Sequence, residues 1–205
     1  MKRRAALAAL ALALVAVLAA CGSEGSDSST SSKDDTTTTV ASTSDGSTPA
    51  GAAGPDACAK AQPIPDGVID GKPTQVDLPS TPTTGKVEVT VLKEGDGPEV
   101  TNSSYVTVHY LGVSCTSGKQ FDSSWDRGEP ITIAMPAAPP TATAFSVIPG
   151  WNQGLLGVKE GTLVQLDIPS ELAYGAQGSP PDIAPNDPLT FVIQVTKVSD
   201  TAPAA

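Results

Sequence analysis

The sequence predicts an α+β fold in which an antiparallel β-sheet wraps around one short α-helix. Two observations in the C-terminal half lead to this prediction. Apolar residues there recur mostly with period two, which is typical of strands that bury one face. Only one apolar segment, residues 147–157, has the character of a helix, and a sheet with one apolar face needs such a cover. We therefore expect residues 86–200 to form one domain with its own core.

The strands are predicted from alternation between turn signals. Gly95-Asp96-Gly97-Pro98 and Thr116-Ser117-Gly118-Lys119 are the clearest turns, and an Ala/Pro/Thr-rich loop covers about 134–144. The alternation places apolar side chains on one face of each strand, for example those of Val106, Val108 and Tyr110. The expected strands cover residues 87–91, 105–110, 120–122, 131–133, 162–168 and 189–198.

The N-terminus has the pattern of an export signal. Three cations within residues 1–4 precede an uncharged Ala/Leu/Val run that ends in small residues, so residues 1–20 are predicted to be a signal peptide. The run ends in Leu18-Ala19-Ala20-Cys21, which resembles the bacterial lipobox, and Cys21 is therefore the expected lipidation site. Acyl chains on Cys21 would anchor the protein to the extracytoplasmic face of the cell membrane. An ordinary signal peptide with an incidental cysteine is the alternative.

Residues 21–55 are rich in Ser and Thr and have almost nothing to bury, which predicts a disordered tether or a plain cell-wall spacer. The formal net charge is −10, and loss of the three signal-peptide cations leaves 9 Lys and Arg against 22 Asp and Glu, or −13. A surface this acidic repels nucleic acid and anionic headgroups, so a nucleic-acid partner is not expected.

Residues 56–85 are rich in proline but retain apolar positions, which predicts an extension packed on the domain, with one short edge strand near 74–78. Two cysteines remain once Cys21 is assigned to lipid. In an exported protein this pair, Cys58 and Cys115, predicts a disulfide that pins the extension to the domain. Two free thiols are the alternative. Residues 201–205 are expected to be a disordered tail.

Several kinds of chemistry find no support in the sequence. His109 is the only histidine, and no Cys-x-x-Cys, Gly-x-Ser-x-Gly or phosphate-binding glycine loop is present. We therefore expect no metal, no cofactor and no nucleophilic residue. A single histidine within a strand is expected to have a structural hydrogen-bonding role.

Five motifs occur in order within residues 86–200. They are Val108-His109-Tyr110-Leu111-Gly112, Gly118-Lys119-Gln120-Phe121-Asp122-Ser123-Ser124, Val147-Ile148-Pro149-Gly150-Trp151, Glu171-Leu172-Ala173-Tyr174-Gly175 and Leu189-Thr190-Phe191. Each motif alone would be weak. Together, in this order and at this spacing, they closely resemble the macrolide-binding, FKBP-type peptidyl-prolyl isomerases.

The resemblance implies a half-barrel sheet around the helix and a proline-binding pocket with Trp151 as its floor. It also implies that the backbone N–H of Ile148 binds a substrate or macrolide carbonyl, and that Tyr174 is a hydroxyl donor. The residues that match catalytic positions are Tyr110, Asp122, Trp151, Tyr174 and Phe191. The residues that match substrate-binding positions are Phe121, Ile131, Val147, Ile148, Ser179 and Ile183.

The sequence departs from the family pattern in places. Ile131 stands where the family often has an aromatic residue, Ser179 and Asp182 replace a commoner His and an apolar residue, and residues 136–144 resemble an insertion. These departures are expected to weaken macrolide affinity and to alter preferences beside the proline. Trp125 is expected on a loop, at the surface or the rim of the pocket.

The function implied by the resemblance is prolyl isomerisation that assists the folding of exported proteins. The expected partners are proline-containing polypeptides and macrolide inhibitors, and the chain is expected to be a monomer. Three alternatives remain. The aromatic residues could form only a core, the pocket could belong to a non-catalytic module that binds proline-containing partners, or the chain could be an inactive spacer. The intact motifs argue against the spacer.

Overall fold

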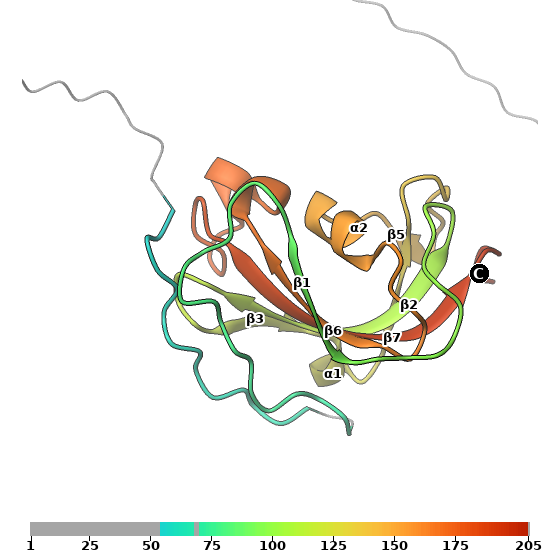
Figure 1. Ribbon diagram of the computed structural model, residues 1–205, viewed down its shortest axis with the longest axis horizontal. Helices are drawn as coiled ribbons and strands as arrows, with labels where there is room; N and C mark the ends of the chain where they lie inside the picture. The colour runs from blue at the N-terminus through green and yellow to red at the C-terminus, as the bar shows by residue number, and fades with distance from the viewer. Residues whose placement is uncertain (1–53, 68–69, 205) are drawn as a thin grey trace, which may run out of the picture. The chain divides into compact units, whose positions relative to one another are not determined.

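The computed structural model describes residues 54–67 and 70–204 of the chain (Figure 1). These residues form one curved seven-stranded sheet in the order β1-β6-β7-β2-β4-β5, with β3 paired to β2 off this path. Every strand expected from the C-terminal alternation is present. The strands are β1 (Glu88–Lys93), β2 (Tyr105–Ser114), β3 (Gln120–Ser123), β4 (Ile131–Ala134), β5 (Ala144–Phe145), β6 (Leu163–Ile168) and β7 (Leu189–Ser199).

The predicted fold class is confirmed, with one correction to the sheet. All strand pairs are antiparallel except β4 and β5, which run parallel, with Thr132 opposite Ala144. A wholly antiparallel sheet was therefore the wrong prediction at this edge. Residues 135–143 form a loop that carries the chain back to the start of β4, so β5 runs in the same direction as β4. A tight hairpin turn at the end of β4 would have made this pair antiparallel.

The helix α2 (Pro149–Leu155) covers one face of the sheet, which we call the front face (Figure 1). Pro149 occupies the first turn, where its missing N–H costs no hydrogen bond. Two glycines allow the helix to approach β6 closely. A Cβ atom on Gly150 would lie 2.4 Å from Ile168, and one on Gly154 would lie 2.7 Å from Leu166. The front face is thus the main core of the domain, and Trp151 is 3% exposed within it.

The opposite face, which we call the back face, is covered by the extension (Figure 1). Its apolar cluster contains Ile64 and Val76 of the extension together with Leu111, Val113, Trp125 and Val192. Trp125 lies on a four-residue helix, α1 (Ser124–Arg127), and is 2% exposed. The expectation of a surface or rim position for Trp125 was therefore wrong. The burial of Trp125 comes from residues about 50 positions earlier, which no local pattern reveals.

The prediction of a single helix was also wrong. Besides α2, the described residues contain α1 and two short 3₁₀ segments, η1 (Ser170–Leu172) and η2 (Gly175–Gln177). Each has only three or four residues. Such a length is too short for an amphipathic period to appear in the sequence.

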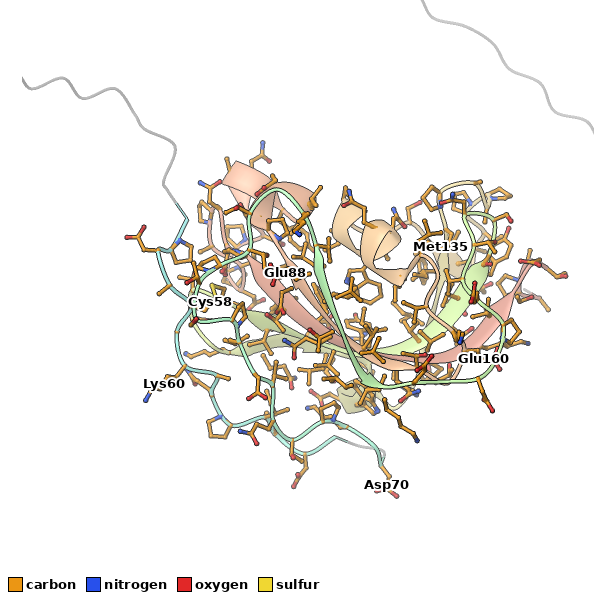
Figure 2. The ribbon with its side chains drawn as sticks, in the orientation of Figure 1. Cys58, Lys60, Asp70, Glu88, Met135 and Glu160 are labelled. Carbon is orange, nitrogen blue, oxygen red and sulfur yellow. A yellow bond between two sulfur atoms is a disulfide. The ribbon has the colours of Figure 1, made fainter. Side chains whose placement is uncertain are left out.

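The disulfide predicted between Cys58 and Cys115 is present. Beside it, the backbone N–H of Ala59 donates to the carbonyl of Cys115 at 2.8 Å, and the N–H of Gln62 donates to the carbonyl of Gly118 at 2.7 Å. Figure 2 shows Cys58 near the start of the described extension and Asp70 at the far end of its loop. The extension is thus tied to the domain by covalent and hydrogen bonds.

The edge strand expected near residues 74–78 does not form, since the first strand among the described residues begins at Glu88. Pro73 and Pro79 flank this stretch and remove backbone donors from it. The Asp77 carbonyl instead accepts one side-chain hydrogen bond, from Gln165 at 2.9 Å. The stretch therefore packs through Val76, which is buried, without joining the sheet.

The predicted signal peptide, the lipidation site Cys21 and nearly all of the predicted tether lie outside the described residues. Within 54–67 and 70–204, no helix has the length and apolar composition needed to cross a membrane.

Candidate active site

A cavity of about 430 Å³ opens between the start of α2 and the front face of the sheet. This volume is in the range of small-ligand sites. The cavity brings together nine of the eleven residues that the family resemblance predicted for the site, and it adds Ser146. Its lining consists of Tyr110, Phe121, Asp122, Ile131, Ser146, Val147, Ile148, Trp151, Tyr174 and Phe191.

Four aromatic rings form the base of the cavity. The Trp151 ring lies edge-on to Tyr110 and to Phe191, with centroid distances of 5.2 Å in both cases. Phe121 is perpendicular to Phe191 at 5.6 Å. Edge-to-face pairs at these distances are favourable and restrict the rotation of each ring. The cavity therefore has a stiff apolar base, on which a small ring of matching size can pack.

Asp122 is the carboxylate of the cavity, and it is held by two partners. The Tyr110 hydroxyl donates to Asp122 Oδ2, and Arg127 Nη1 donates to Asp122 Oδ1. Arg127 Nη2 also donates to the Tyr110 hydroxyl at 2.8 Å. Burial, and then the hydrogen bond to Asp122, raise the pKa of Tyr110 to about 12. The hydroxyl therefore remains a donor at any physiological pH, and the carboxylate stays oriented along the cavity wall.

Arg127 was missed by the sequence reasoning. Its guanidinium carbon lies 5.5 Å from the centroid of the Tyr110 ring, so it contributes a cation–π contact as well as hydrogen bonds. The available signal was an arginine five residues after the pocket carboxylate, in a segment that we interpreted as a loop. The short helix α1 directly follows β3 and brings the guanidinium back to Asp122.

The start of α2 presents a backbone donor to the cavity. Ile148 precedes the helix in an extended conformation, with φ −57° and ψ 149°. Its carbonyl accepts the N–H of Trp151 at 3.1 Å, whereas its own N–H donates to none of the described residues. A free N–H at the wall of an apolar cavity can donate a hydrogen bond to an acceptor atom of a ligand.

Ser179 and Ile183 do not line the cavity. They pair with each other through two backbone hydrogen bonds of 2.9 and 3.0 Å, which close a small loop after η2. Ser179 is exposed, and Ile183 is buried in the front core. Tyr174, in contrast, reaches the cavity and remains 42% exposed, as expected of a residue at the rim.

Residues 97–196 match the family model described as FKBP-type peptidyl-prolyl cis-trans isomerase. The FK506-binding protein of Streptomyces anulatus is 38% identical over 125 residues, which cover 60% of this chain and 95% of that relative. The chain belongs to the FKBP-type peptidyl-prolyl cis-trans isomerase family. The isomerase FkpA of Escherichia coli is 39% identical over 118 residues, covering 58% of this chain and 39% of that relative.

A crystal structure of FkpA from Escherichia coli is also similar, with a TM-score of 0.48 and 36% identity, covering 58% of this chain and 50% of that one. By its family, this chain is a peptidyl-prolyl cis-trans isomerase.

The N-terminal extension, which includes Lys72, lies outside the range of 97–196 that matches the family model.

Proposed function

We propose that the isomerase twists X–Pro bonds of exported polypeptides within the front-face cavity, at the extracytoplasmic face of the membrane. The observation that supports the cavity most directly is its combination of an aromatic base with the free N–H of Ile148. A proline ring packs on the base formed by Trp151 and Phe191. The carbonyl before or after that ring then reaches the Ile148 N–H.

The chemistry needs no nucleophile and moves no proton. A planar amide is stabilised by resonance, and its isomerisation passes through a twisted form in which that resonance is lost. The planar amide also has the larger charge separation, which water stabilises. An apolar cavity removes this advantage of the ground state and holds the proline side of the twisted bond.

Asp122 supplies electrostatic contact with the twisting amide and fixes the hydroxyl of Tyr110. Its charge is balanced by Arg127, so the carboxylate is oriented without leaving an unpaired charge in the cavity. We assign Asp122 no role as a general base. Macrolides that present a carbonyl to Ile148 should occupy the same cavity, with an affinity reduced by the aliphatic wall at Ile131.

Location outside the cytoplasm has two independent supports. The N-terminal pattern is that of a lipoprotein signal, and disulfides such as Cys58–Cys115 persist in oxidising compartments.

We propose that Cys21 carries the lipid. Cys21→Ser should release the protein from the membrane fraction and abolish labelling by a fatty-acid analogue; continued labelling of the variant would exclude Cys21 as the site.

A protease-coupled prolyl-peptide assay on residues 22–205 tests the carbonyl-binding donor. Ile148→Pro removes the N–H while its φ of −57° suits a proline, and Ile148→Ala keeps the N–H while it removes the side chain. Loss of one hydrogen bond to the transition state should lower kcat/KM of Ile148→Pro about tenfold below that of Ile148→Ala.

Equal kcat/KM in the two Ile148 variants would remove the Ile148 N–H from the mechanism. A chain that binds the peptide but does not accelerate its isomerisation would instead favour a non-catalytic proline-binding module. Inhibition by a macrolide in the same assay reports whether ligand and substrate share the cavity.

A further inference from the structure

The extension contributes one charged side chain to the interior of the back face. Lys72 is 3% exposed at its side chain, and its ammonium lies 2.6 Å from Asp126 Oδ1. A lysine is seldom buried to this extent unless it is paired, because burial removes the water that stabilises its charge. Lys159 and Glu94 provide a contrast, since they are 3.3 Å apart and 39% and 74% exposed.

The carboxylate of Asp126 is held from two sides. Gln120 Nε2 donates to Asp126 Oδ2 at 2.6 Å, opposite the bond from Lys72. Burial raises the pKa of Asp126, but the hydrogen bonds from Lys72 and Gln120 outweigh burial, and the pKa lies below its usual value. Asp126 is therefore charged at neutral pH, and Lys72 is the cation that neutralises it.

Asp126 and the site residue Arg127 are neighbours on α1. A four-residue helix has almost no stability of its own, so the contacts of its side chains determine its position. Ser124 at its start receives the N–H of Tyr110 at 2.8 Å, and Trp125 stacks on His109 at 5.4 Å beneath the extension. Arg127 at its end holds Asp122 and Tyr110 in the cavity.

Loss of Lys72 would leave the charge of Asp126 without its cation. Besides Lys72, the cation that has a favourable electrostatic interaction with Asp126 is Arg127. An unneutralised Asp126 would then compete with Asp122 for the same guanidinium. The pocket carboxylate and the Tyr110 hydroxyl would lose the partner that orients them.

We propose that Lys72 of the N-terminal extension is a positioning residue for the isomerase site, because it neutralises Asp126 and thereby leaves Arg127 to Asp122 and Tyr110. Lys72 is absent from the cavity lining and acts through Asp126 of α1, the helix whose Trp125 belongs to the back cluster. This role rests on the proposed assignment of the front-face cavity as the site.

The test compares kcat/KM in the peptide assay with the thermal midpoint of each variant, on the full mature chain with its disulfide intact. Lys72→Met should lower kcat/KM about fivefold at temperatures well below its midpoint, because small displacements of positioning groups reduce the rate. Lys72→Arg should restore most of the activity. Lys159→Met, the same change at the exposed pair, should leave kcat/KM unchanged.

A double substitution separates positioning from a general loss of stability. Lys72→Met with Asp126→Asn removes the competing charge, so its kcat/KM should recover to within about twofold of wild type even if its midpoint stays low. The NMR signals of the Arg127 guanidinium should shift in Lys72→Met and return in the double variant. A double variant as slow as Lys72→Met, or a Lys72→Met variant with wild-type kcat/KM, would overturn the proposal.

Asp122→Val in the same assay distinguishes this proposal from the site assignment. If Asp122→Val is impaired and Lys72→Met is not, only the positioning role fails. If Asp122→Val retains wild-type kcat/KM, the cavity assignment fails and the role of Lys72 fails with it.

Discussion

The two faces of the sheet each bury one tryptophan, but the two rings have different surroundings: Trp151 lines a cavity, whereas Trp125 is packed beneath the extension. Trp151 on the front face is 3% exposed and Trp125 on the back face is 2% exposed. The front cover is a helix, and it leaves a space of about 430 Å³ between its start and the aromatic rings. The back cover is an extended chain that follows the sheet. Trp125 packs against this chain and stacks on His109.

The buried fraction of a tryptophan therefore does not show whether it lines a binding cavity or only fills the core. The segment that covers its face of the sheet makes the difference, because α2 leaves a cavity beside Trp151. Neighbouring residues of one strand show the difference. Phe191 of β7 belongs to the front cluster and lines the cavity, whereas Val192 belongs to the back cluster. Since side chains alternate along a strand, adjacent substitutions can test the two faces with little change in backbone.

The largest contrast is expected between the two tryptophans. Trp151→Ala and Trp125→Ala should each lower the free energy of unfolding by about 3–5 kcal/mol, because both rings are buried. Trp151→Ala should also lower kcat/KM about 100-fold, since it removes the base on which we propose that the proline packs. Trp125→Ala should reduce it less than about tenfold, through the position of α1 alone.

Chemical denaturation and the peptide assay, both at a temperature where each variant is folded, give the two quantities. Equal losses of kcat/KM in the two variants would mean that the front cavity has no special role in catalysis. That result would remove the distinction between the faces.

The disulfide provides the second contrast, in stability rather than activity. It joins residues 57 positions apart, and its loss in a Cys58→Ser, Cys115→Ser variant should destabilise the fold by about 4 kcal/mol on the chain-entropy model. Ile64 and Val76 still bury against the sheet, so below its unfolding midpoint the variant should keep kcat/KM within about threefold of wild type.

Denaturation of the wild-type protein with and without reductant is the control for the disulfide variant, and the reduced protein should match it. A loss of activity far beyond threefold, with the fold intact, would show that the extension affects the site through more than Lys72.

The front face could be predicted from the sequence because its signals are local. Alternation located the strands, and the five motifs contain eight of the residues that line the cavity. The same reasoning placed Ser179 and Ile183 in the site, although the loop after η2 holds them outside the lining. Motif position gives the order of residues along a loop but not the direction in which their side chains point.

The back face could not be predicted in the same way, because its contacts join distant segments. The positions of Trp125 and Lys72 depend on packing between α1 and an extension about 50 residues earlier. The segment near Val76 has the composition of a strand, but with flanking prolines it does not pair with the sheet, and the Asp77 carbonyl accepts a hydrogen bond from the Gln165 side chain instead. Arg127 was missed for the same reason as α1, since four residues are too few to show a helical period.

The smallest expected effect is the response to pH, and it tests whether the two faces are coupled. His109, the only histidine, lies on the back side, where it stacks on Trp125 and its Nδ1 is 3.1 Å from Ser124 Oγ. Burial lowers its pKa below 6.5. The unfolded chain therefore binds a proton before the folded chain does, and stability should decrease as the pH falls through the range below about 6.5.

In the reaction proposed for the front face no proton moves, and the Tyr110 hydroxyl has a pKa of about 12. The value of kcat/KM should accordingly be flat between about pH 7 and 9, while the thermal midpoint begins to fall only under mildly acidic conditions. Measurement of both profiles on the same samples, with His109→Gln as the control, checks this. A step in kcat/KM near pH 6 that disappears in His109→Gln, with the fold intact, would mean that a charge on the back face reaches the cavity through Ser124 and Tyr110, and that the two faces are one functional unit.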